Sequence, residues 1–256
     1  MTDTYAGELD AADEGIFSCV DYDENYLTTT LEIGNNVTKI LPYMFASSAI
    51  TSITIPANVT EIGYNAFQEC TKLSTVEIKD SSTPLYFGYQ VTGIFGSEWG
   101  PFYDSPLATV TLKRDINYVM DANNKPFTPD EWDEGVFANE HDVLTTINLN
   151  ANLTKILPYM FSRTEAANVW IPHTVTSIGD KAFSECKNLL GVTMGYDGTT
   201  DFPSIGIGVF NDCDKFSYIK VREGKDENEV PKIYNKFKNG EKGWSAYTDK
   251  IITGPY

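Results

Sequence analysis

The segment ITSITIPANVTEIGYNAFQECTKL, residues 50–73, decides the fold of this 256-residue chain. Ile53 and Ile55 alternate with Ser52 and Thr54, a spacing that gives a short strand one apolar face and one polar face. The segment therefore predicts a strand that is buried on one side only.

The remainder of the segment turns back toward the interior. Pro56 lacks the N–H that a further ladder bond needs, so it ends the strand, and Gly63 permits a turn that most side chains would oppose. Ala66, Phe67 and Cys70 then return an apolar wedge to the core. One such unit cannot bury both of its sides alone, so we expect the units to stack into a solenoid.

The same unit recurs along the chain with a period of 23 residues. The octapeptide TKILPYMF at 38–45 returns unchanged at 154–161, an offset of 116, and residues 55–73 match residues 171–189 at 11 of 19 positions. We therefore predict a duplicated block and about eight units. The units begin near residues 28, 50, 73, 107, 144, 166, 189 and 216.

These repeats resemble the BspA-like leucine-rich repeats of bacterial surface proteins. The resemblance rests on residues 55–70, 171–186 and, more weakly, 205–213, and it covers roughly residues 15–222. It implies an α/β repeat protein, a right-handed leucine-rich-repeat solenoid with a parallel β-sheet on one face and short turns or helical segments on the other.

The resemblance also carries expectations about function. Members of the family are typically exported or surface-attached and are implicated in adhesion. We therefore expect a non-catalytic extracellular binding module of a bacterial cell-surface protein, which recognises a host or microbial protein or glycan through its strand face. The alternative is a structural spacer of a larger surface protein, with no ligand of its own. No signal peptide is visible at the start of this chain.

We predict a single solenoid domain, residues 1–256, with a cap at each end. Its parts are an acidic N-terminal cap at 1–26, leucine-rich repeats at 27–222 with insertions near 80–106, 114–135 and 195–204, and a C-terminal cap at 223–256. Trp244 and Tyr247 belong to the C-terminal cap. Caps are needed because the open apolar end of a solenoid would fray or associate.

The chain is strongly acidic, with 36 Asp and Glu against 19 Lys and Arg and a net charge of −17. Residues 1–38 and 121–142 together contribute −15 of this charge. So acidic a surface repels phosphate backbones and anionic lipid, and the apolar runs are too short for a membrane span. We therefore expect no nucleic-acid partner and no direct membrane insertion.

The exposed strand positions form the face that solenoids commonly use for binding. Read coil by coil, these positions are Glu32, Thr54, Glu77, Thr111, Asn148, Trp170, Thr193 and Lys220. Trp170 stands out, because Asn168 flanks it and Asn148, Asn150 and Thr193 are expected nearby. An exposed Trp beside amides is a candidate anchor for a sugar or a peptide. The competing interpretation is that an insertion covers Trp170, which then merely packs.

The insertion at 80–106 is rich in aromatic residues and is a second candidate recognition element. Tyr89 and Trp99 are the members that we expect to be exposed. Residues 101–107 take the place of the Ala-Phe-x-x-Cys-x-x-Leu part of a repeat, which predicts that Phe102 is in the core. The competing interpretation is that the whole aromatic cluster packs.

Metal and cofactor chemistry is not indicated. Residues 21–25, with Glu32 at the twelfth position, resemble a calcium loop, but Tyr26 replaces the Gly of the sharp turn. The repeat alignment places residues 27–33 in a strand, which would aim Glu32 away. We therefore predict no metal site and no cofactor.

The four cysteines form no metal-binding pattern. Cys70, Cys186 and Cys213 share one repeat position, so we predict that they are buried, inert residues in a ladder. A disulfide between Cys186 and Cys213 is geometrically conceivable because they lie in successive coils.

A catalytic constellation is not visible either. His173 replaces Ala57 in a turn, and His141 has no identifiable nucleophile beside it. A carboxylate pair formed by Glu32 and Glu77 would have to reach across coils. We therefore predict that the chain is not an enzyme.

Overall fold

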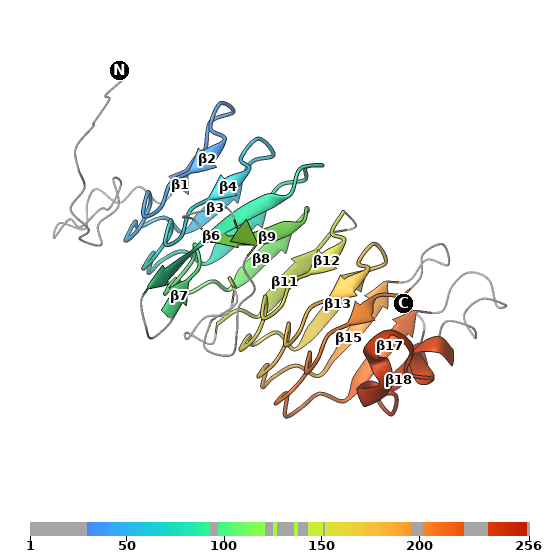
Figure 1. Cartoon of the computed structure of the whole chain (residues 1–256). Helices are drawn as coiled ribbons and strands as arrows, with labels where there is room; N and C mark the ends of the chain where they lie inside the picture. Colours follow the sequence, from blue (N-terminus) through green and yellow to red (C-terminus); the bar gives the residue numbers. More distant parts are fainter. Residues whose placement is uncertain are drawn as a thin grey trace, which may run out of the picture.

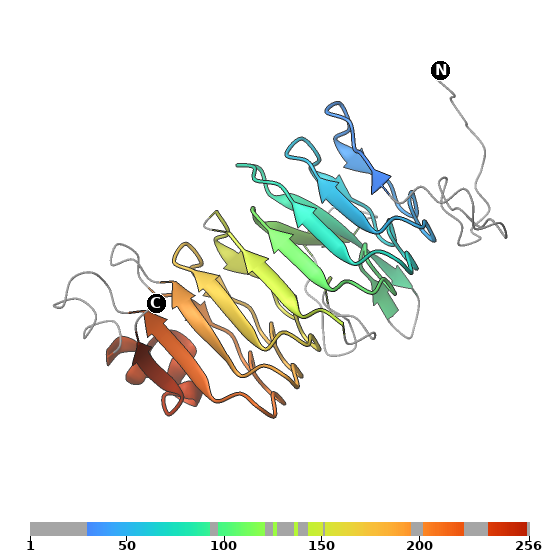
Figure 2. The same cartoon turned by 180° about the vertical axis from the view of Figure 1, so that it is seen from behind.

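A computed structural model describes residues 30–92, 97–120, 125–126, 136–137, 143–150, 152–195, 202–222 and 235–254. The described chain forms an elongated stack of coils, with strands β1 and β18 at opposite ends (Figure 1). Figure 2 shows from behind that the strands run side by side along the whole stack. The predicted leucine-rich-repeat solenoid is confirmed.

The main strands form two all-parallel sheets, ordered β1-β3-β5-β8-β11 and β13-β15-β17-β18. In chain order they are β1 (Thr30–Leu31), β3 (Ser52–Ile55), β5 (Thr75–Ile78), β8 (Thr109–Leu112), β11 (Thr146–Leu149), β13 (Asn168–Pro172), β15 (Gly191–Gly195), β17 (Tyr218–Arg222) and β18 (Ile251–Gly254). The first eight correspond to the eight predicted units. Burial alternates along β3, with Ile53 and Ile55 inside and Ser52 and Thr54 outside, as the period of two requires.

The described coils from β1 to β15 continue into second strands that the sequence did not reveal, most of them only two residues long. These strands are β2 (Lys39–Ile40), β4 (Glu61–Ile62), β6 (Leu85–Thr92), β9 (Ile116–Met120) and β10 (Lys125–Pro126) in one sheet, and β12 (Lys155–Ile156), β14 (Ser177–Ile178) and β16 (Ser204–Ile205) in another. Strand β7 (Ser97–Trp99) pairs antiparallel with β6. A strand of two residues is too short to show alternation, which is why only a turn was predicted there.

Two of the expected insertions begin as ordinary parts of the fold. Strand β6 lies within 80–106 and β9 within 114–135, and they pair parallel with each other. Arg114, at the start of the second insertion, is 1% exposed and donates hydrogen bonds to the carbonyl oxygens of Pro56 and Ala57. The insertions are therefore partly lengthened second strands.

A ladder of phenylalanine rings runs through the core. The rings of Phe45, Phe67, Phe102, Phe137, Phe161, Phe183 and Phe210 stack one on the next, with centroids 5.2 to 5.9 Å apart. Phe102 is 2% exposed, so its predicted place in the core is confirmed. The ladder continues across the break between the two main sheets.

The three described cysteines form a second ladder beside the phenylalanines. Cys70, Cys186 and Cys213 are free, and each thiol donates to the carbonyl oxygen of a Phe in the neighbouring coil, at 3.0 to 3.1 Å. Cys70 and Cys186 are buried, as predicted, whereas Cys213 is only partly buried. Burial raises the pKa of the Cys70 thiol, which keeps it protonated and unreactive.

The glycine of the repeat is explained by the coil before it. A Cβ at Gly63 would lie 2.5 Å from the backbone nitrogen of Pro42, and one at Gly179 would lie 2.4 Å from that of Pro158. The prolines of one coil therefore occupy the space that the glycines of the next leave open.

The last coil is covered by a 3-10 segment, η2 (Glu241–Tyr247), visible at the C-terminal end in Figure 1. Trp244 is fully buried, and its indole N–H donates to the carbonyl oxygen of Pro203 at 2.8 Å. Tyr247 stands edge-on to Phe210. These two aromatic side chains close the end of the described core.

Candidate functional site

The outward positions of the main strands lie in register. Thr54, Glu77, Thr111 and Asn148 are successive partners in the first sheet, and Trp170, Thr193 and Lys220 are successive partners in the second. Glu32 directly follows β1. The strand-face residues predicted from the repeats therefore form two rows in register, one on each main sheet.

Trp170 lies on β13 and is 41% exposed. Its indole lies over Gly195 of β15, because a Cβ at Gly195 would be only 2.4 Å from Cζ2 of the ring. Trp170 thus packs on the backbone of its own sheet and still presents a large part of its ring to solvent.

Tyr218 provides a second ring on the same sheet. A Cβ at Gly191 would lie 2.5 to 2.6 Å from three atoms of this ring, so the ring lies over Gly191. The hydroxyl of Tyr218 donates to Oδ1 of Asn168 at 2.5 Å, reaching across β15. Thr193 lies between the two glycines along β15.

We call this surface the aromatic face, and define it by Asn168, Trp170, Thr193, Tyr218 and Lys220 above Gly191 and Gly195. Tyr218 was not among the predicted site residues. The sequence feature that could have indicated a ring at this place is the pair of glycines in GVTMG, residues 191–195. Glycine inside a strand often marks the close approach of another group.

The predicted strand-face site residues are divided between the two main sheets. Trp170, Asn168 and Thr193 share the second sheet. Asn148 belongs to β11 of the first sheet, where its amide donates to Thr111, and Asn150 follows the end of that strand. No ladder joins β11 to β13 in the described residues, but the two strands lie next to each other, so Asn148 is on the strand beside the one that carries Trp170.

Several other predictions fall outside the described residues. These are the N-terminal cap at 1–26 with its calcium-like loop, His141, and the side chains of Tyr89 and Trp99. The backbones of Tyr89 and Trp99 lie in β6 and β7, away from the sheet that carries Trp170.

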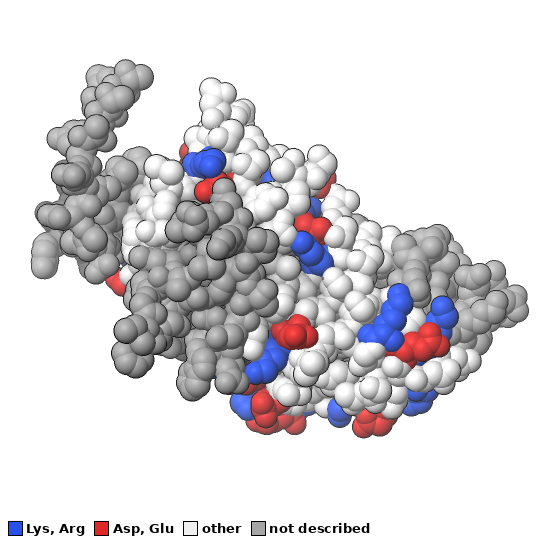
Figure 3. All heavy atoms as spheres, in the orientation of Figure 1, with Lys and Arg blue, Asp and Glu red and all other residues white. Residues whose placement is uncertain are grey.

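Charged side chains on the first sheet neutralise one another. Glu77 contacts Lys113 at 2.6 Å and Lys79 at 2.9 Å, and these hydrogen bonds hold the pKa of Glu77 below its usual value. Figure 3 shows the described Lys, Arg, Asp and Glu side chains of one face in mixed clusters. Glu32 is two strands away from Glu77, with Thr54 between them, so they do not form an acid–base pair.

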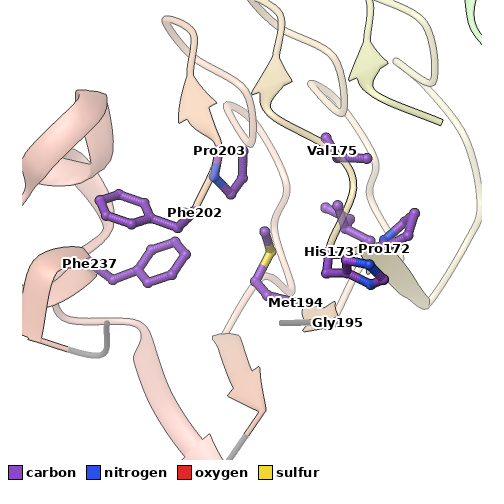
Figure 4. Close-up of a pocket in the computed structure, with 9 residues that line it drawn as sticks. Pro172, His173, Val175, Met194, Gly195, Phe202, Pro203 and Phe237 are labelled. Atoms are coloured by element: carbon purple, nitrogen blue, oxygen red, sulfur yellow. The ribbon is translucent and has the colours of Figure 1, made fainter. Parts of the chain in front are cut away.

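An apolar recess lies beside the aromatic face (Figure 4). Its empty volume is about 240 Å³, open solvent included, and its lining includes Met194, Gly195, Phe202 and Phe237. Phe202 and Phe237 close one side with ring centroids 4.4 Å apart. Among the described lining residues, His173 is the one titratable side chain.

A larger polar hollow, of about 950 Å³ with open solvent included, lies over the loops that follow β5, β8, β11 and β13. Its two carboxylates are engaged by neighbouring coils. Asp80 accepts from the amide of Asn152 at 2.7 Å, and Asp115 accepts from the backbone N–H of Thr154 at 2.7 Å. These groups tie the coils together.

In the described part of the chain, no group of three or more His, Cys, Asp and Glu side chains is arranged to hold a metal ion. In the same residues, no helix has both the length and the apolar character of a membrane span.

The sequence matches the family described as "BspA type Leucine rich repeat region" in six copies, at residues 22–89 and 130–235. These residues make up more than half of the chain. Among curated proteins, no sequence matches this one.

Three solved structures are similar in part. A leucine-rich repeat protein from Bacteroides ovatus is 14% identical with a TM-score of 0.38, over 83% of this chain and 55% of that one. A leucine rich cell surface protein from Faecalibacterium prausnitzii is 21% identical with a TM-score of 0.35, over 77% and 54%. The pneumococcal vaccine antigen PcpA is 13% identical with a TM-score of 0.33, over 86% and 72%. The chain spans about half the length of the first two.

Proposed function

Because the chain belongs to the BspA-type leucine-rich repeat family, we propose that it is a non-catalytic binding module displayed outside a bacterial cell. Its ligand is a host or microbial protein or glycan, held on the outward face of the main sheet. The extracellular placement rests on the family. The binding role rests on the aromatic face.

One observation carries the proposal: Trp170 is 41% exposed on β13, the first strand of the second main sheet, although its position is occupied by a small residue, Thr54, in the first block. A large aromatic ring turned toward solvent adds nothing to the core of the solenoid. Aromatic side chains supply much contact area at a small cost in conformational entropy, so they are common anchors in binding surfaces.

The test is binding of the purified chain to a panel of glycans and extracellular-matrix proteins, with Trp170→Ala and Thr54→Ala as matched variants. We expect binding to be lost in Trp170→Ala and kept in Thr54→Ala, with equal melting temperatures. Binding that survives in both variants would move the site away from the aromatic face. No binding to any member of the panel would favour the structural spacer.

A further inference from the structure

We propose that the aromatic face binds a saccharide that carries carboxylate groups, an inference that rests on the proposed binding function. The site consists of the rings of Trp170 and Tyr218 and the polar side chains of Asn168, Thr193 and Lys220.

The duplicated block provides an internal comparison for this face. At the offset of 116, the inward residues Ile53 and Ile55 become Val169 and Ile171 and stay apolar and buried. The outward Thr54 becomes Trp170. The core of the unit is therefore retained while its outward face changes in character.

The glycines under the two rings also differ between the blocks, as the other outward positions do. Gly191 and Gly195 stand where the first block has Thr75 and Lys79, and the first block forms the same parallel ladder without glycine. Glycine inside a strand destabilises the strand relative to alanine. The fold does not require these two glycines, but the rings do, because a Cβ at either position would collide with the ring above it.

The shape of the face favours a flat ligand. Both rings lie over the backbone, and the neighbouring apolar recess is small. A peptide anchors best through side chains that fill pockets. A pyranose ring instead offers a flat patch of C–H groups, which packs on an aromatic ring, and polar groups around its edge.

The polar groups of the face are mainly hydrogen-bond donors. Oδ1 of Asn168 already accepts from Tyr218, which leaves the amide N–H groups of Asn168 to donate. Thr193 adds a hydroxyl and Lys220 an ammonium group beside it. The outward side chains described on β13, β15 and β17 include no carboxylate. Such a set complements a saccharide edge rich in acceptors, which a uronic or sialic acid provides.

The net charge of −17 does not oppose an anionic ligand at this face. Residues 143–256 contain thirteen acidic and thirteen basic residues, so the acidic excess belongs to residues 1–142. Exposed charges are screened over about 8 Å at physiological ionic strength. The second block can therefore receive a carboxylate at Lys220 with little repulsion.

The test is isothermal titration calorimetry of the full chain with oligogalacturonate, alginate oligomers and sialyllactose. The matched neutral probe is the methyl ester of the oligogalacturonate, and poly-glutamate serves as an acidic polymer without sugar rings. We expect at least one acidic saccharide to bind and its neutral form to bind about tenfold more weakly. Poly-glutamate should not compete.

Variants separate the stacking from the charge. Trp170→Ala and Lys220→Gln should each weaken binding about tenfold, and Lys220→Gln should also reduce the salt dependence. Thr54→Ala and Thr111→Ala, at corresponding positions of the first block, should leave binding unchanged. Circular dichroism and melting temperature confirm that each variant is folded.

The outcomes distinguish this inference from the proposed function. If none of the three acidic saccharides binds, or if the methyl ester binds as tightly as the free oligogalacturonate, the inference is overturned. If a matrix protein then binds in a Trp170-dependent way, the proposed function still stands although the acidic-saccharide inference has failed. If neither saccharides nor proteins bind through Trp170, both fail.

Discussion

Phe137 should couple the two blocks of the solenoid. The ladder of second strands is interrupted between β9 and β12, so the core must carry much of the interaction on that side of the junction. Phe137 is 1% exposed and stacks between Phe102 at 5.9 Å and Phe161 at 5.7 Å, with Phe87 edge-on at 6.1 Å. Its backbone N–H also donates to Met160 of the second block.

Substitution of Phe137 by Ala should cost about 3–5 kcal/mol of unfolding free energy, because it removes a buried ring and leaves a cavity between its neighbours. Of this, each lost ring pair accounts for about 0.5–1.5 kcal/mol beyond the buried area. In a repeat protein each unit is stabilised mainly by its neighbours, so a weak junction should also let the two blocks unfold separately.

Guanidinium unfolding followed by far-UV circular dichroism and by tryptophan fluorescence measures both effects. With Trp99 and Trp132 replaced by Phe in every protein compared, the remaining fluorescence of Trp170 and Trp244 reports on the second block. The wild-type transitions should coincide, and those of Phe137→Ala should separate. Phe137→Leu, which keeps most of the volume, should cost about 1.5 kcal/mol or less. A loss below about 1 kcal/mol in the Ala variant, with coincident transitions, would refute the coupling role.

Three further predictions concern other contacts between coils. Gly63→Ala should destabilise the chain by about 1–3 kcal/mol in urea unfolding, because its Cβ would collide with Pro42; an unchanged midpoint would contradict this close approach. Arg114→Met should cost about 2–3 kcal/mol in the same assay, because two carbonyl oxygens lose a charged donor; a stability equal to wild type would show that these bonds contribute nothing. Glu77→Gln should destabilise the chain at pH 7, and the difference from wild type should shrink as the pH falls below 4.5. The hydrogen bonds from Lys113 and a second lysine lower the pKa of Glu77, so this carboxylate stabilises the fold above its ordinary pKa of 4.5, and the effect is lost as pH falls through the lowered value. A difference between wild type and variant that does not change with pH would contradict this.

The fold could be predicted from the sequence because the inward positions repeat. The period of 23 residues, the strand alternation at Ile53 and Ile55 and the recurring Phe67 and Cys70 each follow from the need to bury one side of every coil against the next. Two-residue strands such as β4 were not readable, because their pairing depends on the neighbouring coil and not on local alternation.

Only part of the candidate site could be predicted from the sequence, because the site depends on which outward residues meet across strands. Trp170 stood out by its size, and the register placed Thr193 next to it. Tyr218 was missed because its ring leans along the sheet to Asn168, a direction that strand spacing does not reveal. Asn148 lies on β11, the strand beside β13, and the break in the ladder between these two strands leaves no mark in the repeat pattern.

The two blocks show how a solenoid separates stability from recognition. Inward residues are constrained on both sides by neighbouring coils, so Val76 and Val192 remain equivalent after duplication. Outward residues meet only solvent and their strand partners, so Glu77 and Thr193 are free to differ. Because a change on the outward face leaves the stacking of the core intact, one block can keep a plain polar surface while the other carries the aromatic face. A transfer of Trp170 with its supporting glycine to the first block should therefore be tolerated by the fold.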